Sequence, residues 1–119
     1  MKILVTGCAG FIGSDLTEYF LNKGYEVVGI DNFNNFYDPK IKEFNISEFK
    51  DHPKFKLYRT DITDREALWK VFEENEIEGI AHFAAYAGVT QSNADPNTWV
   101  FNNIDGTSNL AEFAVKKGV

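Results

Sequence analysis

The chain has 119 residues, a formal net charge of −6 at pH 7, and hydrophobic and charged fractions of 44% and 25%. This length predicts one domain, and the acidic balance without any basic run argues against nucleic acid as a partner. No apolar stretch is longer than a strand, which argues against a membrane span. A single cysteine, Cys8, and the lack of room for a signal peptide before the first strand lead us to expect a cytoplasmic protein.

Short apolar runs alternate with helical patterns along the whole chain. Strands are expected at residues 3–5, 26–30, 55–58 and 79–84, and helices at about 12–23, 39–49, after Thr63, and at 96–117. The short connections predict right-handed crossovers, and therefore an α/β fold with a parallel sheet of strand order 3-2-1-4 and helices on both faces. Ligands of such sheets bind at the carboxyl ends of the strands, where the strand order reverses.

Local signals mark where the helices begin and which face they bury. The first helix carries apolar residues at helical spacing, namely Ile12, Leu16, Tyr19 and Phe20. Thr63 and Glu66 have the spacing of a capping box. Asp95 followed by Pro96 is typical of an N-cap with proline at the first helical position.

Three glycines, Gly7, Gly10 and Gly13, follow the first strand at intervals of three residues. Gly7 allows a tight turn, Gly10 lets a pyrophosphate approach the backbone, and Gly13 lets the helix pack closely. Asp31 ends the second strand, where it is placed to accept hydrogen bonds from an adenosine ribose and to repel a 2′-phosphate. The pattern predicts a site for NAD rather than NADP; the alternative is an ordinary turn that needs small residues.

Other residues at the carboxyl ends of strands support this site. Asp61-Ile62 follow the third strand and Phe83-Ala84-Ala85 follow the fourth, although Asp61 has a second interpretation as an acid that keeps its loop solvated. His82 is interpreted as a core histidine with its hydrogen bonds satisfied. No His, Cys or acidic residues have the spacing of metal ligands, so no metal is expected.

With these residues placed, all 119 residues resemble the N-terminal part of an extended short-chain dehydrogenase/reductase, and most closely the NAD-dependent sugar-nucleotide epimerase/dehydratase family. The resemblance rests on Thr6-Gly7-x-x-Gly10-x-x-Gly13, Asp31-Asn32, Asp61-Ile62, His82-Phe83-Ala84-Ala85 and Asn103-x-x-Gly106-Thr107-x-Asn109-Leu110. It implies a Rossmann-type fold with NAD as cofactor. The cofactor-binding residues that it implies are Gly7, Gly10, Phe11, Ile12, Gly13, Asp31, Asn32, Asp61, Ile62, Phe83, Ala84, Ala85 and Asn103.

Two segments, residues 34–39 and 87–92, are similar to the UDP-glucuronate 4-epimerases of this family. The second departs from them, because Thr90 stands where the group usually has an arginine. The resemblance implies a parent enzyme that epimerises a UDP-sugar at C4 by transient hydride transfer to NAD. A nucleotide-sugar dehydratase or reductase is the alternative, since these enzymes share the remaining pattern.

The family also implies parts that residues 1–119 lack. Its catalytic Ser/Thr and Tyr-x-x-x-Lys lie beyond a fifth strand, and here only Tyr19 and Lys23 have that spacing, in the first helix, where Tyr19 is expected on the packing face. We therefore expect the N-terminal portion of an NAD-binding Rossmann domain, truncated before strand five, without the catalytic and substrate portions and without turnover.

An alternative from another class is a stand-alone, non-catalytic module that binds a dinucleotide or associates with itself. Leu110, Ala114 and Val115 are expected to be uncovered apolar positions in that case. The family implies a homodimer through the helix over residues 96–117.

Overall fold

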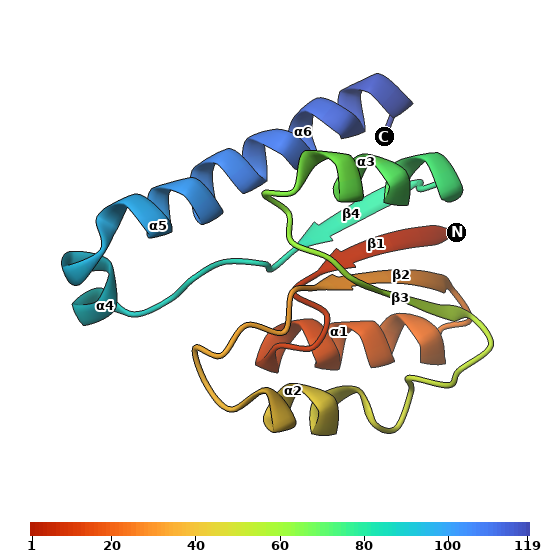
Figure 1. The fold of residues 1–119 in the computed structure, drawn as a ribbon. Helices are drawn as coiled ribbons and strands as arrows, with labels where there is room; N and C mark the ends of the chain where they lie inside the picture. Colours follow the sequence, from red (N-terminus) through yellow and green to blue (C-terminus); the bar gives the residue numbers. More distant parts are fainter.

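The computed structural model describes residues 1–119 and contains one four-stranded parallel sheet of order β3-β2-β1-β4 (Figure 1). Its strands are β1 (Lys2–Thr6), β2 (Glu26–Asp31), β3 (Phe55–Arg59) and β4 (Gly79–His82). Val5 of β1 is paired with Gly29 of β2 and with Ala81 of β4. The predicted strand order is confirmed, and all four carboxyl ends lie at one edge of the sheet.

Helices cover both faces of this sheet. They are α1 (Phe11–Asn22), α2 (Pro39–Ile46), α3 (Arg65–Glu74), α4 (Val89–Ala94), α5 (Pro96–Val100), the π-helix η1 (Phe101–Asp105) and α6 (Gly106–Lys117). α1 and α2 lie on one face, and α3 and α6 lie on the other (Figure 1). None of these helices combines the length and the apolar character of a membrane-spanning segment.

Each face of the sheet has its own apolar core. On the α3 and α6 side, Leu4, Val28 and Ile30 pack against Leu68, Val71, Phe72 and Phe113. On the α1 and α2 side, Val5 and Val27 pack with Cys8, Leu21, Ile46, Phe49 and Phe55. Burial, and then the negative charge of Asp31, raises the pKa of the Cys8 thiol, so Cys8 is a protonated packing residue.

The face that α1 turns toward the sheet differs from the predicted one. Its buried residues are Gly13, Ser14, Thr17 and Leu21, and Tyr19 is 54% exposed, so the expectation of a packed Tyr19 is wrong. Small residues let the helix approach the sheet closely. The buried Thr17 hydroxyl has a hydrogen-bond partner within the helix, because it donates to the Gly13 carbonyl at 2.8 Å. The larger apolar residues of the first turns are left at the surface.

Two further boundaries depart from the sequence expectations. Asp64, not Thr63, caps α3, because its carboxylate accepts from the Ala67 N–H at 3.1 Å. β4 ends at His82 rather than Ala84, level with Thr6, where its partner strand β1 also ends.

The helix predicted over residues 96–117 begins at the Asp95 cap as expected but contains the π-helix η1, and the unpredicted α4 precedes it. Leu110 is buried against α3 and the sheet, so its expected exposure is wrong, whereas Val115 is 80% exposed.

Candidate functional site

A cavity of about 160 Å³ opens at the carboxyl edge of the sheet. Nine of the predicted cofactor-binding residues line it, namely Gly7, Gly10, Asp31, Asn32, Asp61, Ile62, Phe83, Ala84 and Ala85. The other lining residues are Ile30, Asn34, Phe36, Tyr37, Lys42, Thr60, Tyr86, Ala87 and Asn102. Phe11, Ile12, Gly13 and Asn103 lie outside the lining. The structure therefore brings residues from four strand ends and their following loops into one pocket.

The glycine loop forms the floor of this pocket between β1 and α1. Gly7 has a φ of +69°, and a Cβ there would lie 2.8 Å from the Phe83 carbonyl carbon. A Cβ on Gly13 would lie 2.0 Å from the Gly7 oxygen, so the start of α1 packs directly on the turn. No side chain caps α1, whose first N–H groups are therefore free for another acceptor.

Asp31 is held by three donors at the end of β2. Its Oδ2 accepts from the Ala9 N–H at 3.1 Å, and its Oδ1 accepts from the Phe33 N–H and from Lys42 Nζ, both at 2.9 Å. Asp31 and Lys42 side chains are only 4% and 8% exposed, so this is a buried ion pair. Lys42 offsets the charge of Asp31, which makes the repulsion of a 2′-phosphate weaker than Asp31 alone would give.

Lys42 lines the pocket but was not among the predicted site residues. Lys42 and Ile46 are the two buried residues of α2, and their spacing of four residues places them on one helix face. This spacing was available in the sequence, but a lysine on a weakly amphipathic helix is normally exposed. Only the position of Asp31 opposite α2 explains its burial.

Asp61 joins the ends of β2 and β3. Asn32 Nδ2 donates to one of its oxygens at 2.9 Å, and the Thr63 N–H and hydroxyl donate to the other at 2.8 and 2.7 Å. Burial by itself raises the pKa of Asp61, but the hydrogen bonds from Thr63 and Asn32 outweigh it, so the pKa lies below its usual value. An ionised carboxylate thus lines the pocket on the β3 side.

His82 has both ring nitrogens satisfied at the end of β4. Thr6 Oγ1 lies 2.6 Å from Nδ1 and already accepts from the N–H groups of Phe83 and Ala84, so the hydroxyl donates to Nδ1. This assigns the proton to Nε2, which donates to Thr107 Oγ1 at 2.9 Å. Burial lowers the pKa of His82. The predicted hydrogen bonding is confirmed, but the residue is half-buried at the strand end and not in the core.

Two neighbouring asparagines of the π-helix η1 make different contacts. Asn103 accepts from the Tyr86 N–H at 2.8 Å and donates to the Tyr86 carbonyl at 3.0 Å, so it holds the loop after β4 from outside the pocket. Asn102, which the sequence analysis did not single out, is buried, lines the pocket and donates to Asn103 at 2.9 Å. π-helical turns often occur at functional sites, because they displace side chains from regular helical spacing.

The pocket can bind a ligand, but it lacks an acid-base pair of the Tyr-x-x-x-Lys type. Lys23 Nζ lies 5.5 Å from the ring centroid of Tyr19, and neither residue lines the pocket. Lys42 lies equally close to the Tyr37 ring, but it is engaged by Asp31. No group of three or more His, Cys, Asp or Glu residues is arranged to hold a metal ion.

Comparison with known sequences gives long matches. Residues 4–119 match the family model described as GDP-mannose 4,6 dehydratase. The UDP-glucuronate 4-epimerase of Thermodesulfobacterium geofontis is 45% identical over 118 residues, a match that covers 96% of this chain and 36% of that protein. The UDP-glucose 4-epimerase of Bacillus subtilis is 43% identical over 119 residues, or 100% of this chain and 34% of that protein.

Solved structures agree with these matches. A UDP-glucuronic acid 4-epimerase from Bacillus cereus, in complex with UDP-glucuronic acid and NAD, superposes with a TM-score of 0.85 at 40% identity over 96% of this chain and 36% of that chain. A UDP-glucose 4-epimerase from Thermus thermophilus in complex with NAD gives 0.85 at 34% identity, over 100% of this chain and 35% of that chain. The chain thus spans about a third of the length of the relatives it matches. Its sequence and fold together show that it belongs to the GDP-mannose 4,6 dehydratase family, the NAD-dependent epimerases and dehydratases of the short-chain dehydrogenase/reductase type.

Proposed function

We propose that this chain is the NAD-binding part of a nucleotide-sugar 4-epimerase. The observation that carries the proposal is the pocket itself, where Gly7 and Gly10 lie at the open N-terminus of α1 and Asp31 lies at the adjacent end of β2. Backbone N–H groups at a helix N-terminus suit a pyrophosphate, and a carboxylate one strand away suits a ribose diol. Relatives solved with NAD support this assignment.

Different residues of the pocket are assigned to different parts of NAD. Gly10 leaves the space in which the pyrophosphate meets the backbone, Asp31 accepts from the ribose, and Asp61 with Ile62 borders the adenine. Phe83, Ala84 and Ala85 border the nicotinamide half, which this chain completes only in part. Phe11, Ile12, Gly13 and Asn103 act from the edge of the site, as the N-terminal turn of α1 and as the support of the loop after β4.

NAD supplies a hydride acceptor for the sugar C4 carbon in the parent enzyme. The nicotinamide half of the site is incomplete in residues 1–119, so we expect this chain to bind NAD weakly. Without a Tyr-x-x-x-Lys pair at the pocket, we expect no turnover. A UDP-sugar is the substrate class that the two relatives favour. A dehydratase or reductase of the same family is the second candidate, because the family model that matches is described as a dehydratase and Thr90 replaces the usual arginine.

The oligomeric state and location form part of the same proposal. A homodimer through residues 96–117 would cover Val100, Phe101 and Ile104, which are 49%, 53% and 60% exposed. A cytoplasmic location agrees with the one cysteine, which is buried and unpaired. A stand-alone binding module remains the alternative from another class. Chain mass in solution tests the dimer.

Calorimetry with NAD, ADP-ribose and nicotinamide mononucleotide tests the binding role. NAD and ADP-ribose should bind with similar affinity and the mononucleotide should not bind, because the adenosine half is the complete one. Gly10→Ala should weaken NAD binding at least about tenfold, since the new Cβ fills space lining the pocket. Gly79→Ala is the matched control, because a Cβ there meets nothing within 4 Å. Equal affinities of the two variants, or epimerase turnover by this chain, would contradict the proposal.

A further inference from the structure

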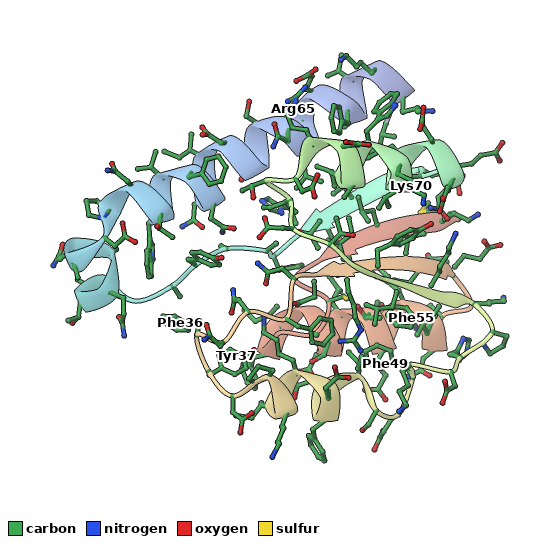
Figure 2. The ribbon with its side chains drawn as sticks, viewed as in Figure 1. Phe36, Tyr37, Phe49, Phe55, Arg65 and Lys70 are labelled. Carbon is green, nitrogen blue, oxygen red and sulfur yellow. The ribbon has the colours of Figure 1, made fainter.

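Three aromatic rings from three separate segments meet beside the pocket. Phe36 belongs to the loop between β2 and α2, Tyr86 to the loop between β4 and α4, and Trp99 to α5. The Trp99 ring lies 6.4 Å from the Phe36 ring and 5.5 Å from the Tyr86 ring, at interplanar angles of 70° and 66°, so both pairs have edge-to-face geometry. Figure 2 labels Phe36 on its loop at the end of the fold where α4 and α5 lie. Phe36 and Tyr86 line the pocket, whereas Trp99 does not.

Each of the two loop rings is held in place by its own backbone contacts. Asn34 accepts from the Phe36 N–H at 3.3 Å, and Asn103 holds the Tyr86 backbone through two hydrogen bonds. Gly88 leaves the space that the Phe36 ring needs, because a Cβ there would lie 3.2 Å from Phe36 Cζ, and its φ of +106° also favours glycine. The rings are therefore positioned by their loops before they meet.

The rings are the connection between these two loops. No hydrogen bond or ion pair joins residues 32–38 to residues 83–94 in the structure. The indole N–H of Trp99 is buried without an acceptor, which weakens the closed arrangement. The two loops are therefore joined by aromatic contacts alone, and one of the rings carries an N–H donor without an acceptor. Such a contact can open and re-form more readily than one made of hydrogen bonds.

We propose that Phe36, Tyr86 and Trp99 form an aromatic clasp that joins the two loops over a bound dinucleotide and sets how fast it is released. The inference rests on the proposed function, since the dinucleotide would lie between Asp31 on one side and Ala84 on the other. Phe36 and Tyr86 line that space from the two loops, so contact between the loops through Trp99 would hold them against the ligand until the clasp opens. The Trp99 ring contacts Phe36 and Tyr86 and so keeps their two loops together. Trp99 itself lies outside the pocket and acts as a positioning residue.

Surface plasmon resonance on the immobilised chain separates NAD association from NAD dissociation. Trp99→Leu and Phe36→Leu should each speed dissociation by about three- to tenfold, the size expected for losing one or two edge-to-face pairs, with association changed less than about twofold. Trp99→Phe keeps a ring and should release NAD at close to the native rate. Because Trp99 does not line the pocket, its effect on release cannot come from a lost ligand contact.

Trp69→Leu is the matched control, because Trp69 packs on Phe113 between α3 and α6, away from the pocket. It should leave both NAD rates unchanged. The double variant Phe36→Leu/Trp99→Leu should release NAD little faster than Trp99→Leu, since the rings act as one unit.

Unchanged dissociation in Trp99→Leu and Phe36→Leu, with NAD still bound, would overturn the clasp alone. A native chain that does not bind NAD would overturn the proposed function and the clasp together. Thermal melting of each variant identifies any that fails to fold. If Trp99→Leu fails, Trp99→Met takes its place, because it also removes the ring from a residue outside the pocket.

Discussion

Lys42 Nζ lies 2.9 Å from Asp31 Oδ1, in an ion pair whose side chains are 8% and 4% exposed. The pair ties α2 to the end of β2, beside the glycine loop whose Ala9 N–H donates to the same carboxylate. Asp31 is thus both a candidate ribose acceptor and a structural anchor. The two roles are compatible, because the donors hold the carboxylate in one orientation.

Lys42→Met should lower the free energy of unfolding by about 3–5 kcal/mol, because it leaves the buried Asp31 charge without its partner. Urea denaturation measures the change. Lys40→Met, on the same helix but exposed, should stay within about 0.5 kcal/mol of the native chain. Equal stability of the two variants would show that the pair contributes nothing to the fold.

Gly13→Ala should destabilise the chain by about 3 kcal/mol, at the upper end of overpacking effects. The new Cβ would lie 2.0 Å from the Gly7 carbonyl oxygen, a backbone atom that cannot move without opening the turn between β1 and α1. Thermal melting monitored by circular dichroism tests this, with Gly79→Ala as the control. A variant as stable as that control would mean that α1 can shift away from the turn.

The free energy of unfolding should fall as the pH drops below about 6.5, through His82. Burial lowers the pKa of His82 in the folded chain below the value of 6.5 for a free histidine, so the unfolded chain binds the proton first. The stabilisation is complete above pH 6.5 and is lost as the pH falls toward the folded pKa. Its slope cannot exceed about 1.4 kcal/mol per pH unit for one group.

Urea titrations between pH 5.5 and 7.5 measure this dependence in the native chain and in His82→Gln. The variant keeps polar atoms near Thr6 and Thr107 but has no ring to titrate. Its unfolding free energy should vary less across this range than that of the native chain. An unchanged pH dependence would assign the effect to other groups.

Asn103→Ala should expose the Tyr86 amide to solvent exchange, because Asn103 Oδ1 is its acceptor at 2.8 Å. Loss of one partly buried hydrogen bond should lower the local opening free energy by about 1 kcal/mol, which is about fivefold faster exchange. Hydrogen exchange by NMR reads this at Tyr86 directly. Asn97→Ala on the exposed surface of α5 serves as the comparison. If the Tyr86 amide exchanged at the same rate in both variants, Asn103 would not be what holds the loop after β4.

Residues close together in sequence were sufficient to predict the sheet and the glycine turn. The apolar runs of β1 and β2, the spacing of Gly7, Gly10 and Gly13, and the acid at position 31 each act through local backbone geometry or strand burial. Parallel strands then place their carboxyl ends at one edge without further information. The glycine spacing and the four strand ends gave Gly7, Gly10, Asp31, Asp61, Ile62, Phe83, Ala84 and Ala85, and the family resemblance added Asn32.

Tertiary packing decided which side chains support that pocket. Lys42 is buried only because Asp31 faces α2, Asn102 and Asn103 divide their tasks only because a π-helix displaces them, and Trp99 reaches Phe36 across two loops. Each relationship depends on contacts between different elements of the fold, so the periodicity of a single segment does not reveal the partner. The sequence by itself therefore determined the strand order and the glycine turn. Only the tertiary structure decided which charged and aromatic side chains contact one another beside that turn, because those contacts join different elements.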